Sequence, residues 1–153
     1  MLKLYVIVEG DLVKYLGLDL GTRTLGVAIS DITKTIATTC QTIHFEDSDY
    51  DDAIKQLSSI IENEPIEKIV LGLPKNMNNS MGERAFITLE FKKKLEDVFK
   101  IEVVMQDERL TTKEASSYMI EADMSRKKRK KKIDSLAANI ILQSYLDKER
   151  MNL

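Results

Sequence analysis

Hydrophobic positions recur along this chain with two periods, one typical of strands and the other of helices. Short apolar or alternating segments predict strands over Tyr15–Leu20, Thr24–Ser30, Thr35–Ile43, Lys68–Leu73 and Ile101–Gln106. Helical spacing predicts helices over Asp49–Asn63, Glu83–Phe99 and Ile133–Leu146, with another helix opening at Thr111. Three strands that precede alternating helices and strands indicate an α/β protein, with a mixed sheet and helices on its faces.

The first predicted strand carries a carboxylate inside an apolar run. Its alternation places Leu16, Leu18 and Leu20 on one face and Gly17 and Asp19 on the other. A buried ionised carboxylate costs several kcal/mol unless it is paired or binds a metal. Gly17 leaves room for a ligand or for another backbone. The strand therefore predicts a cation beside Asp19.

Composition narrows the choice of cation and of compartment. The chain has 153 residues, which suits a single domain, and it contains one cysteine, Cys40, and one histidine, His44. An internal disulfide is excluded, a reducing cytoplasm is favoured, and a Cys/His zinc site is not expected. A metal would take oxygen ligands, as Mg²⁺ or Mn²⁺ does. The apolar runs are too short to span a bilayer, so no membrane partner is expected.

Basic charge is concentrated in one tract. Residues 126–132 are seven consecutive basic residues, whereas the rest of the chain has 16 basic and 25 acidic residues. An acidic body with one basic tract predicts a local contact with a polyanion, made by Arg126, Lys127, Lys128 and Arg129. The alternative interpretation is a solvated loop. Because aromatic residues are sparse nearby, contact with a phosphate backbone is favoured over base stacking.

Further carboxylates stand at the ends of predicted elements. Asp107 and Glu108 close the last strand, and Asp134 opens the final helix. Together with Asp19, such acids can meet at one edge of a sheet and hold metal ions for phosphodiester hydrolysis. With the strand order 3-2-1-4-5, the Asp107 strand is two places from Asp19, roughly 10 Å away.

Each acid also has a structural interpretation. Asp19 can form a buried ion pair with Arg23 or Arg109. Glu108 can pair with Arg109 or accept hydrogen bonds from turn amides. Asp134 stands where helix-capping acids stand.

Two other segments have two interpretations each. The Pro74–Gly82 loop, with Lys75 and Asn76, can cradle phosphate or hold a turn. Residues 1–14 form an N-terminal extension to a single domain over residues 15–150. The extension is either a short extra strand or a non-native start, because codons for Glu9-Gly10-Asp11 can contain a ribosome-binding sequence before a GTG start at Val13.

Several motifs, in this order, cover nearly the whole chain from Tyr15 to Asp147. They are Gly17-Leu18-Asp19-Leu20-Gly21-Thr22-Arg23, Gly26-Val27-Ala28-Ile29-Ser30-Asp31, Gly72-Leu73-Pro74-Lys75-Asn76, Gly82-Glu83-Arg84-Ala85, Asp107-Glu108-Arg109-Leu110-Thr111-Thr112 and Lys132-Ile133-Asp134-Ser135-Leu136-Ala137-Ala138. In these motifs the chain resembles the YqgF/RuvX family. Its members have a ribonuclease H-like fold and are described as Holliday junction resolvases or as nucleases that mature the 5′ end of the small-subunit ribosomal RNA precursor.

The resemblance implies a ribonuclease H-like fold, with a five-stranded mixed sheet of order 3-2-1-4-5 and helices on both faces. It implies a metal-dependent nuclease in which Asp19, Glu108 and Asp134 are the catalytic and metal-binding acids, with Asp107 as the alternative to Glu108. Arg23, and with it Lys75, Asn76 and Arg109, would contact nucleic acid. Partners would be a ribosomal RNA precursor or branched DNA, and ribosomal particles, for a monomer or homodimer in the cytoplasm.

Two rival functions differ in class. The Asp19-Leu20-Gly21-Thr22 turn is similar to the phosphate-binding loop of actin-like ATPases and sugar kinases, but those enzymes close two such domains over a nucleotide and this chain has room for one. A non-catalytic factor for ribosome assembly would keep the basic tract and need no metal.

Overall fold

The five strands in the described part of the protein form one mixed sheet. The computed structural model describes residues 12–74, 82–107 and 126–151, and of residues 126–135 the main chain alone. The sheet has the order β3-β2-β1-β4-β5, with β1 antiparallel to β2 and parallel to β4. The described elements are β1 (Lys14–Leu20), β2 (Thr24–Ser30), β3 (Ala37–His44), α2 (Tyr50–Asn63), β4 (Ile66–Leu73), α3 (Glu83–Phe99), β5 (Glu102–Asp107) and α5 (Arg126–Met151).

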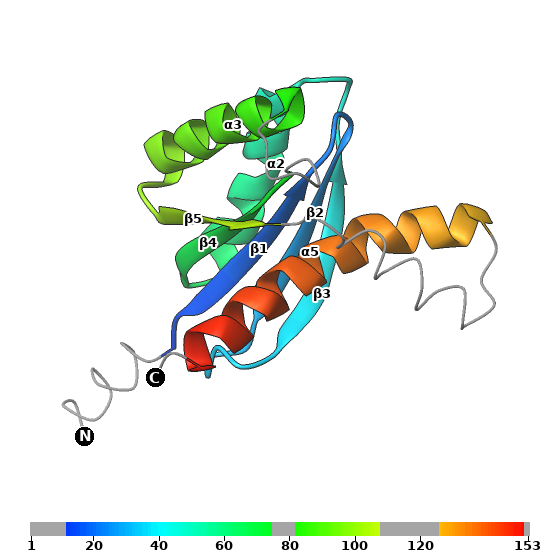
Figure 1. The fold of residues 1–153 in the computed structure, drawn as a ribbon. Coiled ribbons are helices and arrows are strands. Elements are labelled where there is room, and N and C mark those ends of the chain that lie inside the picture. The colour runs from blue at the N-terminus through cyan, green and yellow to red at the C-terminus, as the bar shows by residue number, and fades with distance from the viewer. Residues whose placement is uncertain (1–11, 75–81, 108–125, 152–153) are drawn as a thin grey trace.

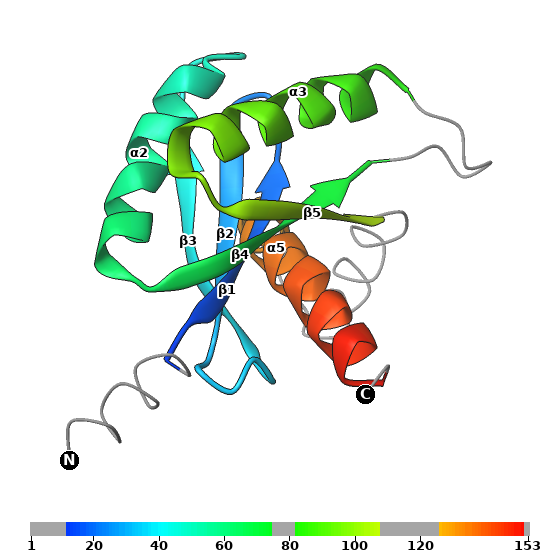
Figure 2. The same ribbon diagram turned by 90° about the vertical axis from the view of Figure 1, so that its left-hand side faces the viewer.

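Helices cover both faces of this sheet. Helices α2 and α3 lie on one face and α5 crosses the other (Figures 1 and 2). The predicted strand order and the placement of helices on both faces are therefore confirmed. The helix expected to open at Thr111 lies outside the described residues, and so do residues 1–11.

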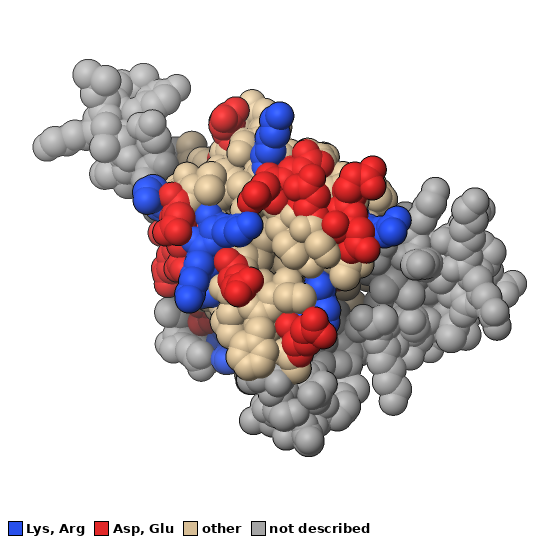
Figure 3. Space-filling view, turned by 90° about the horizontal axis from the view of Figure 1, so that it is seen from above, with Lys and Arg blue, Asp and Glu red and all other residues tan. Residues whose placement is uncertain are grey.

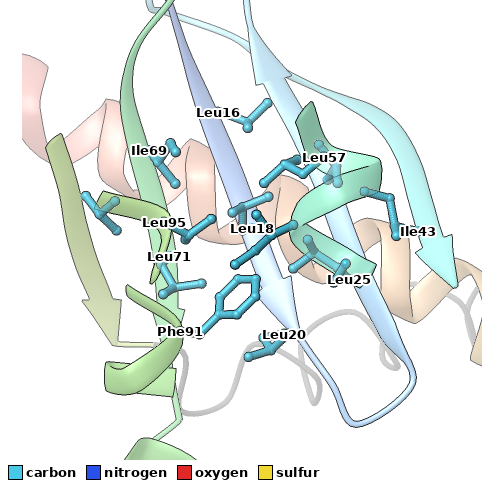
Figure 4. Packing of buried hydrophobic residues seen from close by; sticks show 14 of the residues in the cluster. Leu16, Leu18, Leu20, Leu25, Ile43, Leu57, Ile69, Leu71, Phe91 and Leu95 are labelled. Carbon is cyan, nitrogen blue, oxygen red and sulfur yellow. The ribbon is translucent and has the colours of Figure 1, made fainter. Parts of the chain in front are cut away.

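The main hydrophobic core lies between the sheet and helices α2 and α3. Leu16, Leu18 and Leu20 of β1 all point into it, as their alternation predicts, and Phe91 of α3 packs beside them (Figure 4). All four side chains are less than a tenth exposed. Burial of this kind is the main stabilising contribution to the fold, at about 25 cal/mol for each Å² of apolar surface.

A second core lies under α5, on the opposite face of the sheet. Tyr15, on β1, faces α5, in alternation with the leucines. Apart from Tyr15, the cluster consists of small and aliphatic residues: Ala28, Ala37, Val70, Ala138, Ile141, Leu142 and Leu146.

Helix α5 approaches β1 most closely at Gly17. A Cβ atom at Gly17 would stand 2.6 Å from the Cβ of Leu142 and 3.0 Å from the main-chain oxygen of Ala138. Real Cβ atoms are not found so close to other atoms, and the helix backbone has no freedom to move aside. The sequence predicted that Gly17 leaves room either for a ligand or for another backbone. The structure shows the second, because the backbone of α5 approaches Gly17.

The C-terminal end of α5 is anchored at the start of β1 by polar groups. The Tyr15 hydroxyl donates to Glu149 at 3.0 Å, and the Lys68 ammonium donates to the Tyr145 hydroxyl at 3.0 Å and lies 4.9 Å from the centre of the Tyr15 ring. Burial and the hydrogen bond to Glu149 raise the pKa of Tyr15 to about 12. Burial alone would raise the pKa of Glu149, but the bonds from Tyr15 and Lys68 help to hold it below its usual value. Ionic and aromatic contacts thus fix where α5 ends its path over the sheet.

One predicted boundary is wrong. The final helix begins at Arg126, seven residues before the predicted start at Ile133, so the basic tract is part of α5 and not a loop. The prediction placed the start of the helix at Ile133 because the apolar stripe of the helix begins there. Lysine and arginine have high helix propensity, which favours a helix through this tract.

We expect Gly17→Ala to destabilise the protein by about 1–3 kcal/mol, because the added methyl group overpacks the contact with Leu142 and Ala138. Urea unfolding measures the change. Gly21→Ala is the matched control: its nearest neighbour is the rotatable Thr24 hydroxyl at 3.1 Å, so a smaller loss is expected. Equal stability of wild type and Gly17→Ala would contradict the close contact.

Candidate functional site

The carboxylate of Asp19 lies on the α5 face of the sheet between two glycines. Asp19 pairs with Gly26 on β2. On β4, Gly17 pairs with Val70 and Leu18 with Leu71, where the ladder ends; the next positions along the two strands are Asp19 and Gly72, and Gly72 in turn pairs with Gln106 on β5. By this register the two positions nearest to Asp19 on the neighbouring strands are both glycines. Asp19 itself is half-buried.

This arrangement fits a hard divalent cation. A half-buried carboxylate provides the oxygen ligand that Mg²⁺ and Mn²⁺ prefer, and glycines place no side chain of their own beside it. Among residues 12–74, 82–107 and 136–151, no group of three His, Cys, Asp or Glu side chains is placed to hold a metal. Of the three predicted acids, only the Asp19 side chain falls in that set.

The main chain of α5 brings position 134 alongside Asp19. Helix α5 runs opposite to β1, because Tyr15 contacts Glu149 while Gly17 lies against Leu142 and Ala138. From Ala138, one helical turn of about 5.4 Å leads back to residue 134 on the same stripe of the helix. From Gly17, two strand residues, about 6.6 Å, lead to Asp19. From their contact at Gly17, strand and helix thus lead to the two positions over similar distances and towards the same end of the sheet.

The expectation that Asp134 opens the final helix is wrong, and with it the interpretation of Asp134 as an N-cap. Helix α5 begins at Arg126, so Asp134 is its ninth residue and lies more than two turns inside the helix. An N-cap acid accepts hydrogen bonds from the free amides of the first turn. At Asp134 the amides are already part of the helix, so capping does not explain an acid there.

Asp107 lies on the face of the sheet opposite to Asp19. Leu71 pairs with Met105 and Leu73 with Asp107, and both Leu71 and Met105 pack into the core under α2 and α3. Side chains alternate between faces along a strand, so Asp107 shares the face of Met105. Strand β5 is two strands from β1, as expected, which separates their backbones by about 9.6 Å.

Arg23 lies at the turn that follows Asp19, next to an acidic segment. The amide of Phe45 donates to the Arg23 carbonyl at 3.0 Å, and that of Ser48 to the Thr22 carbonyl at 2.8 Å. The Arg23 guanidinium is 4.0 Å from Asp47, and both side chains are more than 60% exposed. Such an exposed ion pair is weak, so it leaves Arg23 able to exchange Asp47 for a phosphate.

The acidic segment comprises Glu46, Asp47, Asp49, Asp51 and Asp52 at the start of α2. Seen from above, acidic side chains gather over this end of the molecule (Figure 3). The predicted acid Glu108 and the predicted nucleic-acid contacts Lys75, Asn76 and Arg109 lie outside the described residues, as do the side chains of Arg126, Lys127, Lys128 and Arg129.

Comparison with known proteins gives the family. The model of the family RuvX, described as Holliday junction resolvase, matches residues 13–148. The chain belongs to the RuvX family. A Caldanaerobacter subterraneus subsp. tengcongensis protein named "Putative pre-16S rRNA nuclease" is 49% identical over 138 residues, which cover 90% of this chain and 98% of that protein. A Bacillus subtilis protein of the same name is 49% identical over 134 residues, 88% of this chain and 97% of that one.

Solved structures with little sequence identity share the fold of this RuvX protein. Thermus thermophilus RuvC, in complex with a Holliday junction substrate, has a TM-score of 0.58 at 13% identity and covers 92% of this chain and 96% of its own. Fowlpox virus resolvase, in complex with Holliday junction DNA, has a TM-score of 0.57 at 14% identity, covering 89% of this chain and 98% of its own. These likenesses confirm the predicted ribonuclease H-like fold.

Sequence reasoning missed the roles of Gly26 and Gly72. Both belong to motifs that carry the family resemblance, but their position on either side of Asp19 follows only from the pairing register of three strands. The available signal was that each glycine interrupts an apolar strand, which indicates a close approach. No helix in the described part of the chain is long and apolar enough to cross a membrane.

Proposed function

We propose that this RuvX protein is a divalent-metal-dependent nuclease that cleaves the precursor of small-subunit ribosomal RNA in the cytoplasm. The observation that carries the proposal is the half-buried Asp19 between Gly26 and Gly72, with position 134 of α5 alongside it. The names of the relatives support the substrate. Asp19, Glu108 and Asp134 are the proposed catalytic and metal-binding acids.

In this proposal the acids hold Mg²⁺ or Mn²⁺ by their carboxylate oxygens. A bound divalent ion lowers the pKa of a water molecule and stabilises charge on the leaving oxygen. Hydrolysis forms a bond between the water oxygen and phosphorus and breaks the bond to the leaving oxygen, which takes up a proton. Arg23 exchanges Asp47 for a phosphate oxygen and so helps to orient the backbone of the substrate.

The start of α5 is the proposed contact with the phosphate backbone. Its first seven residues are all basic, and they stand at the positive end of the helix dipole. Positive charge at this end is unfavourable in the free protein, and a polyanion relieves it. The acidic segment at the start of α2 repels phosphate, which favours an approach from the α5 side. Lys75, Asn76 and Arg109 are further proposed contacts, and ribosomal particles are the proposed larger partner.

A second candidate function is the cleavage of four-way DNA junctions, because the family model is described as Holliday junction resolvase. The chemistry at Asp19 would be the same, and the substrate would differ. Resolvases cut two strands related by symmetry and act as dimers. A junction substrate therefore requires a homodimer, whereas cleavage of ribosomal RNA is compatible with a monomer.

We expect metal-dependent cutting of a labelled precursor of small-subunit ribosomal RNA, and a loss of about 10³-fold or more in Asp19→Asn and in Asp134→Asn. Each change removes one charge from the metal site and keeps the shape of the side chain. Gel assays with Mn²⁺ or Mg²⁺, beside a four-way DNA junction, measure the loss and the substrate class. Asp51→Asn, on the exposed surface of α2, is the matched control and should retain activity.

Retained cutting in both mutants would contradict the assignment of the acids. Absence of cutting by the wild type, with RNA binding and cellular function kept in Asp19→Asn, would favour the non-catalytic assembly factor. Cutting of the junction alone would favour the resolvase.

We expect Glu108→Gln to abolish activity and Asp107→Asn to reduce it less than tenfold. Asp107 shares the face of Met105, away from Asp19, and strand alternation is the reason for choosing the next residue. The same cleavage assay gives the ratio of the two. If Asp107→Asn loses more activity than Glu108→Gln, then Asp107 is the catalytic acid and Glu108 is not.

We expect replacement of Lys127, Lys128 and Arg129 by Ala to make RNA affinity less dependent on salt. Each phosphate contact contributes about 0.7–0.9 to the slope of log affinity against log salt, so the slope should fall by about 2–3. The matched control replaces Lys92, Lys93 and Lys94 of α3, which changes the net charge equally on the other side of the sheet. If both triple variants give the wild-type slope, α5 does not contact the backbone.

A further inference from the structure

Strand β1 leaves its neighbour β4 just before the catalytic turn. The pairing of β1 with β4 extends to Leu18 and Leu71, whereas the pairing with β2 continues to Leu20 and Leu25. The carbonyl oxygen of Leu20 therefore lies beyond the ladder with β4. A main-chain carbonyl at such a place needs another donor.

Arg84 of α3 provides that donor. Its Nη2 atom donates to the carbonyl oxygen of Leu20 at 3.1 Å. Leu20 stands between Asp19 and the turn at Gly21, whose amide donates to the Thr24 carbonyl at 2.7 Å. The carbonyl of Leu20 and the amide of Gly21 belong to the same peptide, so Arg84 and the Thr24 carbonyl hold the two sides of the peptide group that follows Leu20.

The guanidinium of Arg84 is itself held in place. Its Nη1 atom donates to the Tyr50 hydroxyl at 3.2 Å. The Tyr50 ring makes edge contacts with Phe45, with ring centres 5.9 Å apart, and with Phe91, at 6.1 Å. Phe45 and Phe91 belong to the main core, and they hold the Tyr50 ring in place. Tyr50 in turn holds the guanidinium of Arg84. Arg84 is half-buried, and a planar guanidinium with five donors can bridge two oxygens in this way.

The charge of Arg84 is directed at uncharged oxygens in both of these bonds, to Leu20 and to Tyr50. Neither partner is a carboxylate, so these bonds are not ion pairs. A hydrogen bond from a charged donor is nevertheless stronger than one between neutral groups. The charged group of Arg84 therefore fixes the main chain at the end of β1, where the chain turns towards Arg23.

We propose that Arg84 is a positioning residue for Asp19: by binding the Leu20 carbonyl it fixes the direction in which β1 presents the Asp19 carboxylate to a divalent cation. The proposal rests on the proposed nuclease function. Arg84 acts through the backbone and does not touch the substrate. Small displacements of a catalytic group lower the rate strongly, by about a hundredfold for 1 Å.

The test uses the full-length protein with Arg84→Met, Arg84→Lys and Tyr50→Phe, and with Lys92→Met as the matched control on the same helix. Cleavage of the ribosomal RNA precursor gives kcat and KM at a series of Mn²⁺ concentrations. Electron paramagnetic resonance measures Mn²⁺ binding to the free protein, and amide NMR spectra report the backbone at Asp19 and Gly21.

For Arg84→Met we expect kcat to fall by roughly ten- to a hundredfold, the Mn²⁺ concentration for half-maximal rate to rise, and KM for RNA to stay unchanged. The amide signals of Asp19 and Gly21 should shift. Arg84→Lys should recover part of kcat, because an ammonium group can still donate to one carbonyl. Tyr50→Phe should have an intermediate effect, and Lys92→Met should match the wild type.

Three results would overturn the proposal. An increase in KM alone would make Arg84 a substrate contact. A loss of activity that only follows the folded fraction would make its role purely structural, and wild-type behaviour of Arg84→Met would exclude any role. If the wild type does not cut RNA, the proposed function fails by itself. Mn²⁺ binding and the two amide signals then decide on Arg84: shifted signals in Arg84→Met support the positioning role, and unchanged signals overturn it.

Discussion

The packing of α5 against β1 at Gly17 is the contact on which the rest of the α5 face depends. It brings a helix backbone to within 3.0 Å of where a Cβ atom would stand, so only glycine fits. From this contact the strand continues to Asp19 and the helix leads back to residue 134, so Gly17 is the nearest point at which helix and strand are fixed to each other. The glycines that the register places on either side of Asp19 add no side chains at that level.

Much of the fold followed from periodicity, because the core residues recur at strand and helix spacing. The alternation of Leu16, Leu18 and Leu20 against Gly17 and Asp19 was predicted and is confirmed. The start of α5 was not predicted, because the basic tract contains no apolar residue that could show a helical period, although lysine and arginine favour a helix. Pairing register is likewise invisible in one sequence, so neither the glycines beside Asp19 nor the opposite face of Asp107 was foreseen. The resemblance to a family indicated Asp19, Glu108 and Asp134 as the catalytic acids. The register places Asp107 on the opposite face from Asp19, and this is the physical reason not to choose Asp107.

Charge on this protein is divided between the two layers of helices. The acidic segment at the start of α2 adjoins the turn that carries Arg23, and the basic start of α5 belongs to the other face of the sheet. Asp19 lies at the boundary between them. A net charge of −2 therefore says little about the partner, since what a polyanion meets depends on the side from which it approaches.

Helix α5 is held at two places that lie about two turns apart, at Glu149 by Tyr15 and Lys68, and at Leu142 and Ala138 by Gly17. The α5 residues of the second core all fall within this stretch. Residues 138–149 can therefore leave the sheet only by separating that core, which costs more free energy than the fraying of a helix end. Residue 134 lies outside the stretch, one turn beyond Ala138 towards the start of the helix, so the part of α5 that can open without disturbing the core is the part that carries Asp134 and the basic tract.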